Sequence, residues 1–165
     1  MRLLKLLLVM IACTAAGPAV AGPYEDGFSA YARDDYATAA TIFRKLAEQG
    51  NAKAQYWLGI MYFKGRGVPQ DHAQSFAWFR KAAERGHDIA QFELGIMYDR
   101  GPGVPQDYVQ AHKWFNLAAS NFRESEKADR DKAAKRRDEL AAKMTPAQIA
   151  EAQRLMREWK PTPNR

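Results

Sequence analysis

Histidine is the side chain best suited to proton transfer and metal binding near neutral pH, and the sequence holds three, at His72, His87 and His112. None belongs to an H-E-x-x-H pair or to a compact cluster of histidines and carboxylates, the patterns that zinc sites use. No serine lies in a nucleophile-elbow pattern, and no carboxylate pair suggests acid–base catalysis. The residues therefore predict a protein that is not an enzyme and has no metal or cofactor.

Cysteine and glycine offer two further kinds of chemistry. Cys13 is the single cysteine, so its count excludes an internal disulfide and a multi-cysteine zinc site. Two Gly-x-Gly turns, at 65–67 and 101–103, could cradle a phosphate, but they lack the Lys-Ser/Thr of a P-loop and follow predicted helices rather than strands. We interpret them as helix stops.

The element that positions these residues is a repeat of 36 residues. When residues 51–86 are laid over 87–122, 18 of the 36 positions are identical. The identities include Leu58–Tyr62 with Leu94–Tyr98, and most of the segment from Gly65 to Asp71 with its copy. Self-similarity at this period indicates an array of stacked units, each too small to bury its apolar face alone.

Within each unit the pattern predicts helix, turn, helix. Ala54, Leu58 and Met61 recur at the three-and-four spacing of one helical face. The turn glycines supply the positive φ that ends this helix, and the following Pro69 prevents it from continuing. Asp71 stands where an N-cap would begin the second helix.

The spaced residues of this unit, Ala54-x-x-x-Leu58-Gly59-x-x-Tyr62-x-x-Gly65-x-Gly67, with Asp71 and Trp78-x-x-x-Ala82-Ala83-x-x-Gly86, resemble the Sel1-like repeat. The motif recurs from Ala90, so residues 51–86 and 87–121 form two repeats, and residues 24–50 resemble a shorter, degenerate copy. The resemblance implies an all-α, right-handed solenoid related to tetratricopeptide arrays. It also implies a protein-interaction scaffold, of a kind that bacteria often export for envelope assembly or signalling.

Residues 122–160 predict a charged helix followed by a capping helix, with a short tail at 161–165. The segment from 122 onward carries 12 positive and 8 negative charges. Pairs such as Glu126 with Arg130 and Asp131 with Lys135, four residues apart, predict an exposed helix of mixed charge rather than a basic face. No nucleic-acid partner is therefore expected.

The final helix has a clear predicted start, because Thr145, Pro146 and Gln148 form a capping box with proline at the first position. Its apolar stripe predicts a cap on the open end of the array, with docking on a partner as the alternative. The stripe consists of Ile149, Ala152, Leu155, Met156 and Trp159.

Candidate binding residues follow from comparing the two repeats. Trp57 is replaced by Glu93, and Phe63 by Asp99, which predicts that Trp57 and Phe63 are exposed aromatics suited to anchoring a partner. By the resemblance, the first helix of each pair lines a concave face, with Trp57 beside the row. For Tyr56 and Phe92, packing between hairpins is an equal alternative. The candidates are Lys53, Tyr56, Trp57, Ile60, Phe63, Ile89, Phe92, Ile96 and Asp99.

The first 21 residues predict a secretory signal. A positive start at Arg2 and Lys5 precedes the apolar stretch Leu6–Ala12, and Ala19–Ala21 forms an A-x-A cleavage site. Cleavage near Ala21-Gly22 would leave a periplasmic or secreted chain with no membrane span. The alternative is a lipid anchor at Cys13, whose preceding residues resemble a lipobox.

These observations predict an exported scaffold or adaptor that binds a protein or peptide partner in the cell envelope through its concave face. One alternative is a glycan- or peptidoglycan-binding protein that stacks sugars on the same aromatics. A second is a cell-wall or drug hydrolase, for which the sequence presents no catalytic residues.

Overall fold

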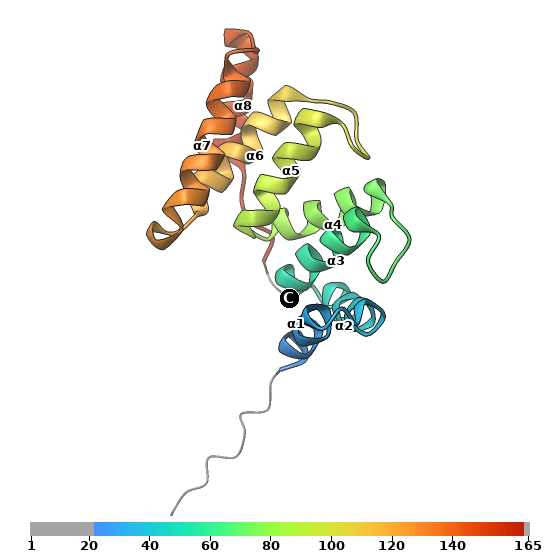
Figure 1. Ribbon diagram of the computed structural model, residues 1–165. Helices are drawn as coiled ribbons and strands as arrows, with labels where there is room; N and C mark the ends of the chain where they lie inside the picture. Colours follow the sequence, from blue (N-terminus) through green and yellow to red (C-terminus); the bar gives the residue numbers. More distant parts are fainter. Residues whose placement is uncertain (1–21, 164–165) are drawn as a thin grey trace, which may run out of the picture.

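The computed structural model describes residues 22–163, which are helical with no strand in that range. The predicted signal segment and Cys13 lie outside the described residues. Each hairpin packs on the next, so the second helix of one contacts the first helix of its successor (Figure 1). This is the all-α solenoid that the repeat predicted. The three hairpins are α1 (Pro23–Ala32) with α2 (Tyr36–Glu48), α3 (Ala52–Lys64) with α4 (His72–Glu84), and α5 (Asp88–Arg100) with α6 (Tyr108–Asn121).

The turns inside the second and third hairpins adopt the conformation that their glycines predicted. Gly65 and Gly101 end α3 and α5 in the left-handed region, with φ of 66° and 80°. Two residues later, a Cβ added to Gly67 would lie 2.2 Å from the carbonyl oxygen of Tyr36, and one on Gly103 would lie 2.3 Å from that of His72. The second glycine of each turn therefore contacts the first residue of the second helix in the preceding hairpin.

Small residues let the two helices of each hairpin approach closely. A Cβ added to Gly59 or Gly95 would lie 2.7 Å from the ring of Phe79 or Phe115. Both phenylalanines are fully buried, so their rings fill the space that the glycines leave open. The same helix contact is thus repeated in both hairpins.

Side-chain caps begin the helices at the predicted positions. Asp71 accepts a hydrogen bond from the backbone N–H of Gln74 at 2.9 Å, and Asp107 accepts one from Gln110 at 3.0 Å. The first helices of the second and third hairpins are capped as well, which the sequence analysis had not assigned. Asn51 caps α3, and His87 caps α5, where its Nδ1 accepts from the N–H of Ala90 at 3.2 Å. These caps fix where each helix begins.

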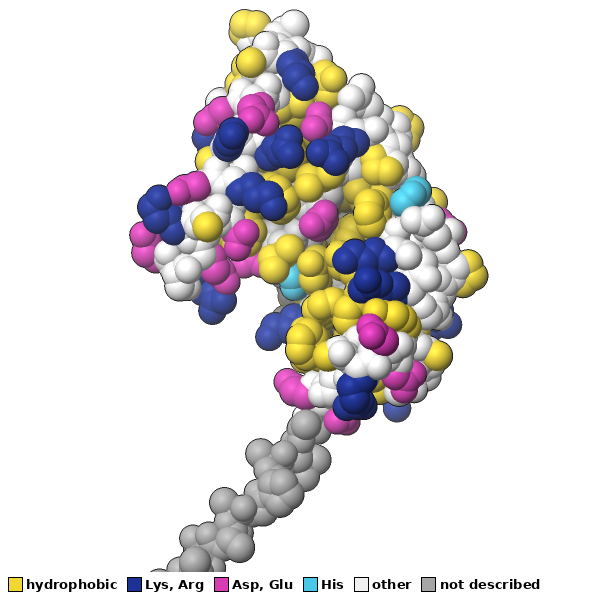
Figure 2. Space-filling model, viewed as in Figure 1, with side chains coloured by type: hydrophobic (Ala, Val, Ile, Leu, Met, Phe, Trp, Pro, Cys, Tyr) yellow, Lys and Arg dark blue, Asp and Glu magenta, His cyan; other side chains and the backbone are white. Residues whose placement is uncertain are grey.

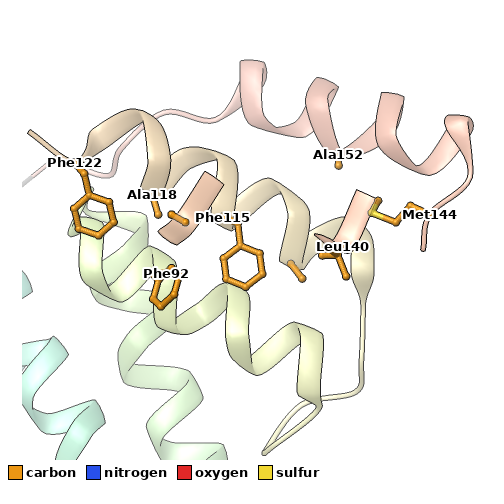
Figure 3. Packing of buried hydrophobic residues seen from close by; sticks show 9 residues of the cluster. Phe92, Phe115, Ala118, Phe122, Leu140, Met144 and Ala152 are labelled. Atoms are coloured by element: carbon orange, nitrogen blue, oxygen red, sulfur yellow. The ribbon is translucent and has the colours of Figure 1, made fainter. Parts of the chain in front are cut away.

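The C-terminal region closes the array. After a short 3-10 turn, η1 (Glu124–Glu126), α7 (Lys127–Ala141) and α8 (Pro146–Glu158) both pack on α6. Thr145 and Gln148 form the predicted capping box. Ala152 is fully buried in a cluster that also takes in Phe92 and Phe115 between α5 and α6 (Figure 3). The apolar stripe of α8 therefore covers the end of the solenoid, as predicted.

The ion pairs of α7 differ from those expected. Glu126 pairs with Arg123 and caps η1, while Arg130 reaches back to Glu124 at 2.7 Å. Asp131 pairs with Lys127 at 2.6 Å rather than with Lys135. The expected pairing was wrong because residues 123–126 fold into a separate turn, which brings its own charged side chains to the start of α7. The helix is also not solvated on every side, since Ala133 and Leu140 are buried.

Candidate functional site

The exposed large apolar side chains of residues 22–163 all come from the first helices of the hairpins. Phe28, Phe63 and Ile89 are 46%, 38% and 40% exposed, and they belong to the first helices α1, α3 and α5. We call the surface formed by α1, α3 and α5, and continued by α7, the first-helix face. Figure 2 shows hydrophobic side chains along the middle of the molecule, over α3 and α5, with Lys and Arg side chains beside them. Such an apolar strip flanked by charges is typical of an interaction surface.

A small pocket opens on this face between α5 and α7. It has a volume of about 90 Å³ and is lined by Ile89, Phe92, Glu93, Phe122, Asp129 and Lys132. The ammonium of Lys132 lies 4.9 Å from the centre of the Phe92 ring, a cation–π contact. The pocket brings two of the predicted residues, Ile89 and Phe92, together with two that the sequence analysis missed, Glu93 and Lys132.

Glu93 is the polar centre of the face. Burial raises the pKa of its carboxyl group, and the nearby cations Lys132, Lys64 and Arg100 act in the opposite direction. Glu93 was seen in the sequence only as the residue that replaces Trp57, and the nearness of Lys132 had no sequence signal because it comes from the charged segment after the repeats. The arrangement places one partly desolvated carboxylate among three cations beside apolar side chains.

The structure corrects the prediction for Trp57. Its indole is half-buried and stacks on Phe43 at 6.0 Å with an interplanar angle of 10°. It also contacts Phe28 and Tyr31, and its Nε1 donates a hydrogen bond to the hydroxyl of Tyr24 at 2.9 Å. Trp57 is therefore not an exposed anchor: it belongs to the packing between the first and second hairpins. Glu93 can replace it because the surroundings of α5 differ from those of α3.

Tyr56 follows the alternative that was left open for it, packing between hairpins, while Phe92 is buried in a different place. The Tyr56 ring stacks on His87 at 4.9 Å and also lies near Phe79, and burial raises the pKa of its hydroxyl to about 12. Phe92 is buried against Phe115. Tyr56 therefore packs between neighbouring hairpins, whereas Phe92 packs inside the third hairpin and beneath α7, and it reaches the first-helix face only where it lines the pocket.

The remaining predicted residues are divided between two places. Lys53 is exposed, 5.6 Å from the Tyr24 ring, and lines an open hollow of about 700 Å³ where the turns between successive hairpins meet. Phe63 lies on the first-helix face with its ring 5.1 Å from that of His72. Ile60, Ile96 and Asp99 are half-buried. The predicted set is therefore not one continuous site.

The histidines take up structural positions. His87 caps α5, and burial lowers the pKa of its imidazole. His112 is buried in α6, where burial is again the main cause that lowers its pKa. Within residues 22–163, no three His, Cys, Asp or Glu side chains are grouped so that they could hold a metal ion.

None of the helices between residues 22 and 163 combines the length and the apolar character that crossing a bilayer requires. The fold and the face together define a helical repeat protein with an apolar strip and charged side chains on its first-helix face. The model of the Sel1 repeat matches residues 19–51, 52–87 and 88–121. The chain belongs to the Sel1 repeat family, whose members generally mediate protein–protein interactions and whose fold is typically a non-catalytic scaffold.

Solved structures show the same architecture. A protective antigen present in uropathogenic Escherichia coli strains, described as displaying an SLR fold, is 33% identical over 83% of this chain, with a TM-score of 0.75. The chain spans 29% of the length of that antigen. A Sel1 repeat protein from Oxalobacter formigenes is 36% identical, with a TM-score of 0.61, over 71% of this chain and 86% of its own. No curated protein matches the sequence.

Proposed function

We propose that the protein is an exported scaffold or adaptor that binds a protein or peptide partner of the cell envelope through its first-helix face. One observation carries the proposal: the exposed large apolar side chains among the described residues, Phe28, Phe63 and Ile89, all lie on the first helices of successive hairpins. A monomeric protein rarely leaves such residues aligned on one surface without a binding role.

The chemistry of the face indicates what a partner must offer. Apolar side chains would gain from burial against Phe63 and Ile89, at about 25 cal/mol per Å² of apolar surface removed from water. Lys64, Arg100 and Lys132 surround Glu93 and favour acidic groups beside those apolar anchors. The best fit is therefore a segment in which aliphatic or aromatic residues alternate with carboxylates.

The test is capture from a solubilised envelope extract with the wild-type chain and the double variant Phe63→Ala, Ile89→Ala, followed by binding of the purified captured protein. We expect the double variant to weaken that binding at least about tenfold, the size typical of losing interface anchors. Its helicity and melting temperature should be nearly those of the wild type, because both side chains are exposed.

A matched control changes two exposed positions on a second helix, Thr41→Ala and Lys45→Ala in α2. Equal binding by the wild type, the control and the double variant would refute the first-helix face as the site. Weakened binding by the control alone would assign the interaction to the second helices of the hairpins.

The proposed export of the protein depends on the residues that precede the described part of the chain. A positive start, a short apolar stretch and an A-x-A motif support export, and mass measurement of the mature N-terminus tests it. A chain that begins at Gly22 supports cleavage by signal peptidase. A lipidated chain that begins at Cys13 would show an anchored form, and an intact Met1 would contradict export.

The glycan-binding alternative has less support than it had from the sequence. It depended on Trp57 as a flat, exposed stacking surface, but the faces of this indole are engaged by Phe43 and Tyr31. Phe63 alone offers a small platform. Competition by soluble peptidoglycan fragments in the capture experiment separates the two functions.

A further inference from the structure

The last described residues of the chain do not end with the capping helix but return along the array. Residues 159–163, the tail segment, leave α8 in an extended conformation that starts at Trp159 (φ −67°, ψ 138°). Figure 1 shows this stretch running back from α8 past α6 toward the earlier hairpins. The capping role of α8 needs no residue beyond Met156, because Ala152 and Ile149 already cover the core. The tail segment therefore calls for a separate explanation.

The tail segment is seated by two kinds of contact. Trp159 meets Trp114 edge to face at 6.3 Å and packs beside the buried residues of α4 to α6. Further on, the N–H of Thr162 donates to the carbonyl oxygen of Glu84 at 2.7 Å, and Arg85 donates to the carbonyl oxygen of Pro163 at 3.0 Å. Folded domains hold extended, proline-containing peptides in grooves lined by aromatic side chains, and Trp114 supplies such a side chain here.

The surface under the tail segment extends beyond it. Thr162 stands at the rim of a hollow of about 360 Å³ whose other walls include Trp78, Lys81 and Gln55. Trp78 is the repeat equivalent of Trp114, yet it is only half-buried, and the ammonium of Lys81 lies 4.0 Å from its ring centre. The tail segment therefore covers the tryptophan of the third repeat, and its Thr162 reaches the hollow beside that of the second.

A buried acceptor at this hollow is unpaired. Gln91 and its repeat equivalent Gln55 each donate to a carbonyl of the preceding helix, and the Oε1 of Gln91 also accepts from Asn121 at 2.9 Å. The Oε1 of Gln55, which is 3% exposed as a residue, has no partner in the described part of the chain. Arg85 is the repeat equivalent of Asn121, and its side chain donates a hydrogen bond to the carbonyl oxygen of Pro163 in the tail segment. A buried acceptor without a donor is unfavourable and marks an incompletely filled site.

We propose that this surface, which runs from Trp114 across Arg85 to Trp78, is a second interaction site that takes an extended segment of a partner protein with an aromatic residue two positions before a proline. The chain's own Trp159-Lys160-Pro161 has that pattern and occupies part of the site until a partner's segment displaces it. Displacement has to withdraw the half-buried Trp159 from Trp114, but residues 160–163 are exposed and held by few contacts, so a partner segment that brings its own aromatic residue can replace them. Proline keeps such a segment extended, so little conformational entropy is lost on binding.

The experiment uses the full chain and a fluorescently labelled synthetic peptide of residues 157–163 as the probe, with binding followed by fluorescence anisotropy. Thr162→Pro removes the N–H that Glu84 accepts while the backbone stays extended, and Thr162→Ala is the matched control that keeps it. Trp159→Ala removes the anchor. We expect Thr162→Pro and Trp159→Ala to bind the peptide at least about tenfold more tightly than the wild type and Thr162→Ala, because the tethered segment no longer competes at its high local concentration.

Two further results decide the proposal. A peptide with alanine in place of its tryptophan should lose binding to every variant, whereas Phe63→Ala, Ile89→Ala should bind the normal peptide as the wild type does, since the first-helix face lies elsewhere. Absence of saturable binding to folded Thr162→Pro and Trp159→Ala up to about 1 mM peptide, the range of a tethered segment, would overturn the proposal and make the tail a fixed part of the fold. A wild-type dimer that the peptide dissociates would also overturn it, because the occupant would be a second copy of this chain.

Discussion

The second and third hairpins share half of their residues, yet they present different surfaces. In both, the turn glycines, the aspartate N-caps and the glycine–phenylalanine contacts coincide almost atom for atom. The differences lie at other equivalent positions. Glu93 takes the place of Trp57, and Trp78 is less buried than Trp114. The Oε1 of Gln55 lacks a hydrogen-bond donor, whereas that of Gln91 accepts from Asn121. The shared residues build the hairpin, and the neighbours of each hairpin decide what its variable residues do.

The most sensitive comparison is between the two equivalent tryptophans. Trp114 is 4% exposed under Trp159, so Trp114→Ala should lower the free energy of unfolding by about 3–5 kcal/mol. Trp78→Ala should cost less than about half as much, because this indole is only partly buried. Urea denaturation followed by circular dichroism measures both. Equal losses would show that the tail segment contributes nothing to the burial of Trp114.

The turn glycines offer the next test. Gly103→Ala should cost about 2–4 kcal/mol, because a positive φ is combined with a Cβ placed 2.3 Å from the carbonyl oxygen of His72. Gly101→Ala has the same sign of φ but only ordinary contacts at 3.4 Å, so it should cost about 1–2 kcal/mol. Gly67→Ala should match Gly103→Ala if the turns of the two hairpins are equivalent. A large difference between Gly67→Ala and Gly103→Ala would break that equivalence.

A smaller effect is expected at the buried glutamines. Either Gln→Leu change removes the side-chain hydrogen bond to a helix-end carbonyl, that of Ala47 or that of Ala83. Each carbonyl keeps the bond from a backbone N–H, that of Gly50 or that of Gly86. Gln91→Leu also takes away the acceptor of Asn121, whereas Gln55→Leu removes an oxygen that was already unpaired. We therefore expect Gln91→Leu to be the more destabilising by about 1 kcal/mol in urea denaturation. The reverse order would mean that the Oε1 of Gln55 is satisfied in solution.

The smallest effect concerns pH. The cap of α5 needs the Nδ1 of His87 deprotonated, and burial, assisted by Lys53, lowers the pKa of this imidazole. As the pH falls, the imidazole is therefore protonated in the unfolded chain before it is protonated in the folded one. The stability that His87 contributes is complete above about pH 6.5, the ordinary pKa of the unfolded chain, and it declines as the pH falls from there toward the lower pKa of the folded chain.

The variant that tests it is His87→Asn, which copies the Asn51 cap of α3. The fall in melting temperature between about pH 7.5 and about pH 5.5 should be smaller in this variant than in the wild type. Asn51→His should make the fall larger. His112, whose pKa burial also lowers, contributes equally in all three chains and cancels from the comparison. An unchanged pH dependence in both variants would exclude His87 as its source.

Predictions from the sequence were most successful for residues whose type favours one local backbone structure, such as a turn or a helix cap. The glycines of the turns, the cap at Asp71 and the capping box at Thr145 could be predicted because each depends on residues a few positions away. Trp57 was misjudged because its neighbours Tyr24, Phe28 and Tyr31 come from a degenerate hairpin with no counterpart for comparison. The return of the tail segment to Glu84 could not be predicted, because its two hydrogen bonds both go to backbone carbonyl oxygens of distant residues, one from the N–H of Thr162 and one from the side chain of Arg85, and a carbonyl acceptor leaves no sequence pattern.

The contact of Gly67 with Tyr36, repeated by Gly103 with His72, has a consequence for how such proteins evolve. One part of the joint between successive hairpins is a contact with backbone atoms that every amino acid possesses, and this contact needs only a glycine on one side. A gene segment that encodes one unit can therefore be duplicated, lost or exchanged, and the new neighbours will meet at the same angle. Selection is then free to diversify the outward side chains of each unit separately, as the contrast between the exposed Phe63 and its counterpart Asp99 illustrates.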